Sequence, residues 1–129
     1  MRIEAYFQQI QQCLAQSSII RLSNVNYEKR GTYEGFIRGE LHCVDGSMLH
    51  LREFLDVETT IERLMYAYQY MAADGTLIFR YDNTGHHKKL GLSTYPHHKH
   101  DGSEVNVISS DAPKLADILK EIELLIALP

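Results

Sequence analysis

Two Asp-Gly pairs, each preceded by a run with strand-like alternation, constrain the fold of this chain more than any other feature. Asp45-Gly46 follows a long run over residues 32–44, and Asp74-Gly75 follows a tyrosine-rich run. The two central residues of a tight hairpin must tolerate positive φ, which Asp and Gly do. The pairs therefore predict two hairpins, and consecutive hairpins favour an antiparallel meander sheet.

Further strands are expected around these turns. Residues 19–27 alternate, a return strand covers 48–57, and a short final strand is expected at 105–108. Gly35 and Gly39 lie inside the first long strand. Interior glycines of this kind often mark bulges or the close approach of another segment.

Residues 58–73 fit two structures. Tyr66, Tyr68 and Tyr70 recur at every second position, as in a pleated strand. Apolar residues of the same segment also recur at helical spacing. We expect the strand, because the Asp-Gly turn that follows would complete a hairpin. The three tyrosines would then share one face, either as part of the core, which is favoured, or as a surface on which bases stack.

An amphipathic helix is expected at each end of the chain. Apolar residues recur at helical spacing over Ile3–Leu14 and again over Leu115–Ile126. Asp111 is a plausible N-cap of the second helix, with Pro113 in its first turn. Both helices must bury their apolar stripes, most simply on one face of the sheet. The expected fold class is α+β: a single domain over residues 1–129, with a five- to six-stranded antiparallel meander sheet and N-terminal and C-terminal helices packed on one face.

Composition limits the function classes. The formal net charge of the 129 residues is −4, which disfavours a protein that coats duplex DNA nonspecifically but allows a local basic patch. No apolar stretch approaches the roughly 20 residues of a membrane helix, and the first residues lack a signal-peptide pattern. Cys13 and Cys43 lie far apart and are expected to be free thiols. These features predict a cytoplasmic protein without a membrane partner.

Histidines and cations crowd into and around the polar segment from Asp82 to Ser103, which is expected to be a long loop. Five of the seven histidines lie there: His86, His87, His97, His98 and His100. Four cations accompany them: Arg80, Lys88, Lys89 and Lys99. Loops this long are uncommon in compact domains unless they are functional or mobile. Any chemistry of this chain is therefore expected between Tyr81 and His100.

Three interpretations of this segment remain open. Two imidazoles could act as general acid and base on an RNA phosphodiester, since histidine titrates near neutrality and RNA supplies its own 2′-hydroxyl nucleophile. No cofactor is expected in that case. Alternatively, His98, His100 and one of the first pair could bind zinc or another divalent metal together with Asp82. Third, the histidines could be solvated side chains, or part of a noncatalytic module that binds RNA or a protein.

Other polar residues of the strands carry weaker signals. Arg52 and Glu53 are expected to form an exposed ion pair, with a phosphate clamp as the alternative. His42 and His50 are isolated and are interpreted as structural.

Three motifs of this part of the chain together resemble the TumE family of toxins from prokaryotic type II toxin–antitoxin systems: Phe79 to Asn83, the pair His86-His87, and the run Tyr95 to His100. The similarity extends over most of the chain after Ile19. Gly85 stands where the family pattern tends to have proline, and glycine leaves φ less restricted. The resemblance implies a toxin with a cognate antitoxin that carries a DNA-binding domain, and an RNA target is expected for toxins of this size.

The leading hypothesis is a toxin that acts on RNA through this histidine-rich segment. The expected catalytic residues are His98 and His100 as the acid–base pair, with His86 and His87 beside them. Phosphate or RNA binding is expected from Arg80, Lys99, Lys88 and Lys89, and an orienting role from Asp82, Asn83 and Tyr81. An exposed sheet edge would also permit a homodimer.

Overall fold

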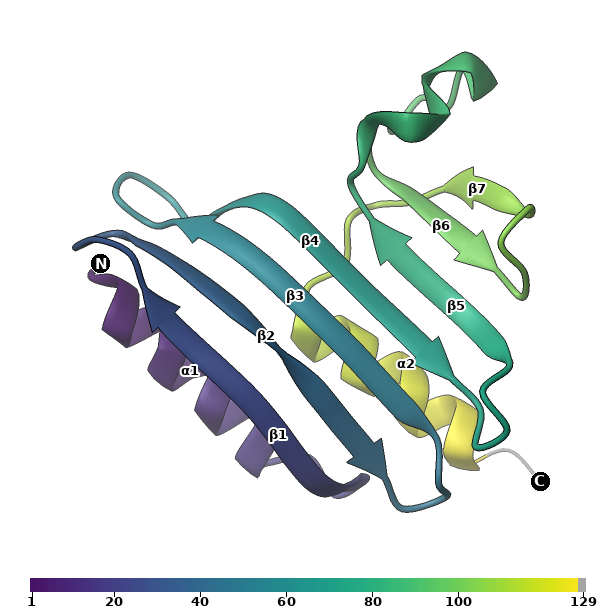
Figure 1. The fold of residues 1–129 in the computed structure, drawn as a ribbon, viewed down its shortest axis with the longest axis horizontal. Coiled ribbons are helices and arrows are strands. Elements are labelled where there is room, and N and C mark those ends of the chain that lie inside the picture. The colour runs from purple at the N-terminus through teal and green to yellow at the C-terminus, as the bar shows by residue number, and fades with distance from the viewer. Residues whose placement is uncertain (128–129) are drawn as a thin grey trace.

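The computed structural model describes residues 1–127 and shows a seven-stranded antiparallel sheet with two α-helices (Figure 1). In chain order the elements are α1 (Ile3–Ala15), β1 (Ile20–Lys29), β2 (Glu34–Cys43), β3 (Met48–Asp56), β4 (Glu62–Met71), β5 (Leu77–Asp82), the 3-10 helix η1 (Gly85–Leu90), β6 (His98–Asp101), β7 (Val107–Ser109) and α2 (Leu115–Ala127). The strands are neighbours in the sheet in the same order as in the sequence. The predicted α+β meander is confirmed, with seven strands in place of the five or six expected.

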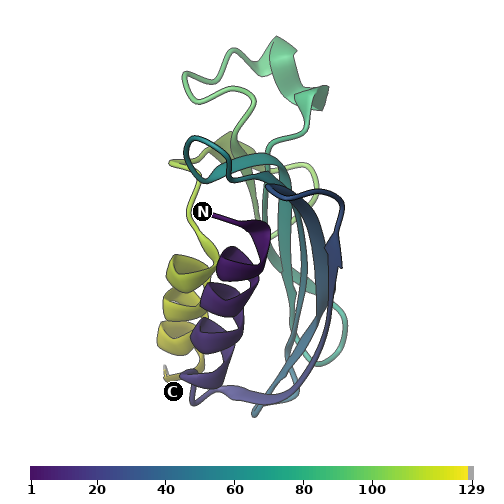
Figure 2. The same ribbon diagram turned by 90° about the vertical axis from the view of Figure 1, so that its left-hand side faces the viewer.

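The two α-helices lie side by side on one face of the sheet, and neither covers the opposite face (Figure 2). Their apolar stripes are buried, as the helical spacing predicted: Ile3, Phe7 and Ile10 on α1, and Ile118 and Ile122 on α2. The packing of both helices on one face is therefore confirmed. It leaves the polar side of the sheet open to solvent and ligands.

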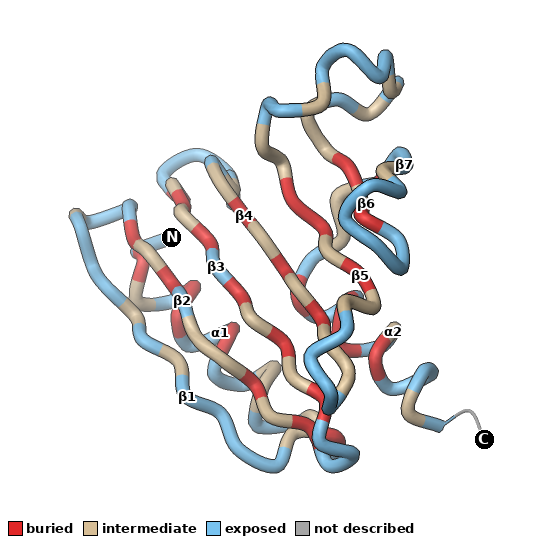
Figure 3. Tube along the Cα trace, turned by 45° about the vertical axis from the view of Figure 1, so that its right-hand side comes forward, coloured by how far each residue is buried: buried red, intermediate tan, exposed pale blue. Residues whose placement is uncertain are grey.

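The segment that fitted both a helix and a strand is strand β4. Tyr66, Tyr68 and Tyr70 are each no more than 1% exposed and point toward the helices. Alternate residues of β3 and β4 are buried, which gives the striped pattern in Figure 3. The preference for a strand is confirmed, and the tyrosines belong to the core, so they offer no stacking surface for bases.

Both predicted Asp-Gly turns are present. Gly46 and Gly75 have φ angles of 87° and 86°, which only glycine adopts without strain. The carboxylates of Asp45 and Asp74 each accept a hydrogen bond from the backbone N–H two residues later. Side chain and backbone therefore agree on the position of each hairpin.

The glycines inside β2 allow close approach, as predicted. A Cβ on Gly35 would lie 2.6 Å from Ile3 Cγ1 of α1, and one on Gly39 would lie 2.4 Å from the carbonyl oxygen of Asn24 on β1. Helix α1 therefore packs against the sheet at Gly35, where a side chain would push it away.

Two local predictions in the C-terminal half are wrong, and a third, the final strand, is confirmed with shifted bounds. The segment after Asp82 is not one long loop, because it contains η1 and strand β6, which pairs with β5 along its whole length. The final strand is β7, slightly later than expected, and α2 begins at Leu115, so Asp111 is not its N-cap. Ala112, just before α2, has a left-handed backbone conformation with φ of 56°. Its carbonyl accepts a hydrogen bond from the guanidinium of Arg63.

The predicted exposed ion pair between Arg52 and Glu53 is also wrong. Neighbouring residues of a strand point to opposite faces, so Arg52 faces solvent while Glu53 faces the helices and is 1% exposed. The Glu53 carboxylate accepts hydrogen bonds of 2.5 Å from the hydroxyls of both Tyr6 and Tyr68. A polar group thus links α1 to the sheet inside the core.

The two cysteines are free thiols, as predicted, with Cys43 buried and Cys13 partly so. Across residues 1–127, no helix has the length and apolar character needed to cross a membrane.

Candidate functional site

The pairing of β5 with β6 builds the candidate site on the uncovered face of the sheet. In register, Arg80 lies opposite His100 and Asp82 lies opposite His98. Directly opposed residues of an antiparallel pair point to the same side. A guanidinium, a carboxylate and two imidazoles are therefore brought together from segments about twenty residues apart.

Three imidazoles form the centre of this site, and we refer to His87, His98 and His100 as the histidine cluster. The Nε2 atoms of His98 and His100 are 3.2 Å apart, and both side chains are almost completely buried. His87, on η1, places its ring centroid 4.7 Å from that of His98 and 5.3 Å from that of His100. The structure thus gathers three of the expected catalytic histidines, one of which is reachable from solvent.

The hydrogen bonds of the buried pair determine where their protons lie. His98 Nδ1 is 2.9 Å from the carbonyl oxygen of Pro96, and His100 Nδ1 is 2.9 Å from that of Glu104. A carbonyl only accepts, so both Nδ1 atoms carry hydrogen. Arg80 Nη2 lies 3.1 Å from His100 Nε2 and can only donate, so this Nε2 presents a lone pair.

His98 Nε2 then faces acceptors on two sides. It lies 3.2 Å from the lone pair of His100 and 2.9 Å from Oδ1 of Asp82. Such an arrangement is stable only with a cation between the acceptors, either a proton on His98 Nε2 or a metal ion.

Asp82 is the anionic centre of the site and is 4% exposed. Burial by itself would raise the pKa of its carboxyl group, but hydrogen bonds from the backbone and hydroxyl of Thr84, and the charges of His98 and Arg80, lower this pKa below the ordinary value. The Thr84 donors are at 3.0 and 2.9 Å. Asp82 is therefore a carboxylate at neutral pH, and its oxygens lie 2.9 Å from Nε2 of His98 and 3.9 Å from Nε2 of His100.

Arg80 is already engaged by several partners. It forms a two-pronged pair with Glu104 at 2.6 and 2.7 Å, and it donates to Asp82 at 3.2 Å and to Gln69 at 3.1 Å. Hydrogen bonding to Glu104 raises the pKa of the guanidinium. A phosphate at Arg80 would have to displace Glu104, which is the more exposed partner.

A cavity of about 610 Å³ opens beside the cluster. His86, His87 and His100 line it together with Arg80, Asp82 and Thr84. Burial, together with the charges of His98 and His100, lowers the pKa of His87. Its imidazole is therefore neutral at neutral pH and faces a space large enough for a ligand.

Several residues expected at the site lie elsewhere. Lys99 and Tyr81 point to the helix face, where Tyr81 donates to Glu121 of α2 at 2.6 Å and the Lys99 ammonium lies 3.4 Å from the same carboxylate. Lys88 and Lys89 are exposed on η1. The lysines therefore do not surround the histidine cluster.

Asn83 and His97 lie outside the histidine cluster and connect the histidine-rich segment to the rest of the sheet. Asn83 accepts from the backbone N–H of Tyr66 at 3.0 Å and donates to the carbonyl of Leu64 at 3.2 Å. His97 Nδ1 lies 2.8 Å from the Tyr66 hydroxyl, and the two rings are stacked. Both side chains attach the histidine-rich segment to β4.

Sequence reasoning missed Thr84 and Glu104. Thr84 follows Asp82 by two residues, the spacing of an Asx turn, and this pattern was available in the sequence. Glu104 had no local signal, because its contact with Arg80 spans 24 residues and depends on the turn between β6 and β7.

The same geometry could hold a divalent metal. The nitrogen ligands of His87, His98 and His100 all lie within 4.8 Å of one another, and Asp82 adds a carboxylate oxygen. Two nitrogens bound to one tetrahedral zinc ion at about 2.0–2.1 Å are about 3.3 Å apart. The 3.2 Å separation of the His98 and His100 Nε2 atoms fits this value, and both rings already donate from Nδ1 to a carbonyl, as metal-bound histidines do.

Comparison with protein-family models matched the family described as Toxin TumE over residues 10–126, nearly the whole chain. The chain belongs to the TumE toxin family. This membership confirms the resemblance carried by the histidine-rich segment and makes the protein a toxin of the toxin–antitoxin type, with an antitoxin as its general partner. Searches of curated proteins and of solved structures gave no significant match.

Proposed function

We propose that this TumE-family toxin cleaves RNA at the histidine cluster. The observation that carries the proposal is the convergence of the histidine cluster with a buried carboxylate and a guanidinium, beside a cavity that His87 and His100 line. Imidazoles move protons near neutral pH, and RNA contains the 2′-hydroxyl that attacks its own phosphodiester. The expected target is therefore RNA. We also expect the toxin to act in the cytoplasm and its antitoxin to carry a DNA-binding domain.

The geometry favours other catalytic roles for the histidines than those expected from the sequence. His98 and His100 were expected to be acid and base, but their Nε2 atoms are 3.2 Å apart and leave no room for a phosphate between them. His87 instead faces the cavity with a lowered pKa, and burial is the main cause of the shift. We assign His87 as the general base and the His98–His100 pair as the proton source.

The proposed step balances without a redox partner. His87 takes the proton of the 2′-hydroxyl, and the 2′-oxygen forms a bond to phosphorus. The bond from phosphorus to the 5′-oxygen then breaks, which leaves a 2′,3′-cyclic phosphate. The proton on Nε2 of the buried His98 passes to Nε2 of His100, which lines the cavity, and from there to the 5′-oxygen.

The close approach of the His98 and His100 lone-pair atoms also favours a second candidate, in which the cluster binds zinc or another divalent metal. The ligands would be His87, His98, His100 and Asp82, and the metal would stabilise the charge that develops on the phosphoryl oxygens. Elemental analysis of the purified protein separates the two mechanisms. Loss of cleavage in EDTA, with recovery on addition of zinc, would replace the metal-free mechanism with the metal-dependent one.

The test compares purified toxin with His87→Ala and with a matched control, His42→Ala, on total RNA. His42 lies on β2 beside Glu40 and outside the histidine cluster. We expect the His87 variant to cleave about 100- to 10,000-fold more slowly, the usual contribution of a general base, and the control to cleave at the wild-type rate. Induced expression should arrest growth for wild type and control alike, and the His87 variant should relieve the arrest.

A noncatalytic binding module predicts a different result. RNA would remain intact with every variant but would still shift on a gel with the wild type. That outcome would contradict RNA cleavage and leave RNA binding as the activity of the toxin.

A further inference from the structure

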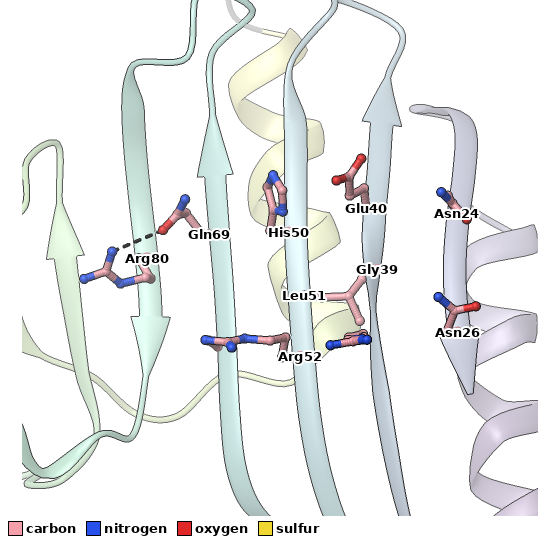
Figure 4. A pocket seen from close by; sticks show the side chains of 11 residues that line it. Asn24, Asn26, Gly39, Glu40, His50, Leu51, Arg52, Gln69 and Arg80 are labelled. Atoms are coloured by element: carbon pink, nitrogen blue, oxygen red, sulfur yellow. Dashed lines mark hydrogen bonds between the residues drawn. The ribbon is translucent and has the colours of Figure 1, made fainter. Parts of the chain in front are cut away.

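The uncovered face of the sheet carries a second hollow, separate from the histidine cluster. A groove of about 480 Å³ runs across β1 to β5 (Figure 4). Its lining is dominated by polar side chains, among them Asn24, Asn26, Arg38, His50, Arg52 and Gln69. Large apolar side chains are scarce along it, so it is unlike a groove for an amphipathic helix.

Two arginines at the centre of this groove have no ionic partner within residues 1–127. Arg38 of β2 and Arg52 of β3 are direct cross-strand neighbours, and both are exposed. Glu40, the acidic residue in the groove lining, lies 3.4 Å from Nε2 of His42. Like charges directly opposite one another destabilise a sheet, so this pair has no benefit for the fold alone. An anionic ligand would relieve the repulsion.

The groove and the cavity beside the histidine cluster share part of their walls. Arg52, Ala67, Gln69 and Arg80 line both. A ligand that crosses the sheet from β2 toward β6 passes over four strand spacings of about 4.8 Å, or about 19 Å in all. Its far end then lies at His87.

We propose that this groove binds the RNA strand that the histidine cluster cleaves, with Arg38 and Arg52 holding backbone phosphates. The inference rests on the proposed function and adds the substrate class, which is single-stranded RNA. The amide side chains of Asn24, Asn26 and Gln69 can donate to and accept from base edges, which are accessible in a single strand and hidden in a duplex. Within residues 1–127 no Phe, Tyr or Trp lines the groove, so the proposed recognition relies mainly on phosphates and amides.

The test measures binding of a fluorescent single-stranded RNA of mixed sequence to full-length protein. All proteins carry His87→Ala, which prevents cleavage during the measurement. The variant Arg38→Gln/Arg52→Gln removes both free cations, and Lys120→Gln on the exposed side of α2 removes one charge from the helix face as a control. Circular dichroism checks that each variant keeps the fold.

Each phosphate contact contributes about 0.7 to the slope of log affinity against log salt for a single strand. Removing two contacts should therefore reduce the slope by about 1.4 and weaken binding about 25-fold at about 0.1 M salt. The Lys120 control should bind as tightly as its parent. Arg38→Lys/Arg52→Lys keeps both charges and should retain most of the affinity.

Three results would overturn the inference. If the double Gln variant binds RNA as tightly as its parent while wild type still cleaves RNA, the groove is not the RNA track and the proposed function survives. If the double Gln variant binds RNA normally, but the same two substitutions in a toxin that retains His87 abolish its inhibition by the co-expressed antitoxin, the groove is a protein-binding surface. If wild type neither binds nor cleaves RNA, the proposed function fails together with the inference.

Discussion

Removal of the Asp82 carboxylate should destabilise the protein strongly, and by an amount that depends on pH. The side chains of Asp82 and His98 are 5% and 2% exposed, and Oδ1 of Asp82 lies 2.9 Å from Nε2 of His98. Removing one partner of a buried pair leaves the other uncompensated and costs about 3–5 kcal/mol. We therefore expect Asp82→Ala to lower the free energy of unfolding by that amount at pH 7.

The matched variants refine this expectation. Asp82→Asn keeps an oxygen for the Thr84 donors but loses the charge, so its cost should be about 1.5–3 kcal/mol, the value of a charged hydrogen bond. Asp101→Asn is the control, because its 3.8 Å contact with Lys99 is half exposed and surface pairs contribute about 0–1 kcal/mol.

The pH dependence follows from the lowered pKa of Asp82, in which hydrogen bonds and nearby positive charges outweigh burial. A depressed carboxyl pKa stabilises the folded state above the ordinary value of 3.8, and this stabilisation is lost as pH falls through the lower folded value. Urea denaturation at pH 7 and at pH values below 3.8 should show the gap between wild type and Asp82→Asn narrowing in acid. An equal gap at both pH values, or an Asp82→Ala variant as stable as the Asp101 control, would refute the reasoning.

Three further outcomes are expected. Glu53→Ala leaves the buried hydroxyls of Tyr6 and Tyr68 without an acceptor, which should lower the free energy of unfolding by about 1–3 kcal/mol for each hydroxyl. Glu53→Gln can still form a hydrogen bond to both hydroxyls and should cost less. Equal losses for the two variants in thermal or urea denaturation would contradict the hydrogen-bonded arrangement. The acidic limb of the profile of RNA cleavage rate against pH should have its midpoint below pH 6.5, because the pKa of His87 is lowered; a midpoint above 6.5 would argue against His87 as the base. Gly35→Val should destabilise by about 1–3 kcal/mol, since a Cβ there would meet α1 at 2.6 Å, and an unchanged midpoint of denaturation would show that the helix can shift.

The elements that sequence reasoning predicted well are those defined by nearby residues. The turns at Gly46 and Gly75 depend on a glycine with positive φ and on a preceding aspartate that accepts a backbone hydrogen bond, and the helices depend on apolar spacing within a dozen residues. The tyrosines of β4 were placed correctly because their period of two and the turn that follows agree with each other.

The elements that sequence reasoning missed depend on partners far away in the chain. Strand β6 consists of His98 to Asp101, and buried imidazoles take the positions where a strand normally carries apolar residues, so no alternation of hydrophobicity reveals it. Glu53 looked like a surface residue beside Arg52, and only the approach of Tyr6 from α1 makes its burial possible.

The amino-acid sequence by itself determined where the candidate site was expected, because the imidazoles and cations are concentrated between Arg80 and His100. Only the tertiary structure decided which of these side chains meet. The register of β5 with β6 places His98 and His100 with Asp82 on the open face and turns Lys99 toward α2, since side chains alternate along a strand. That register is set by pairing between distant segments, and one residue of slip would exchange the two faces.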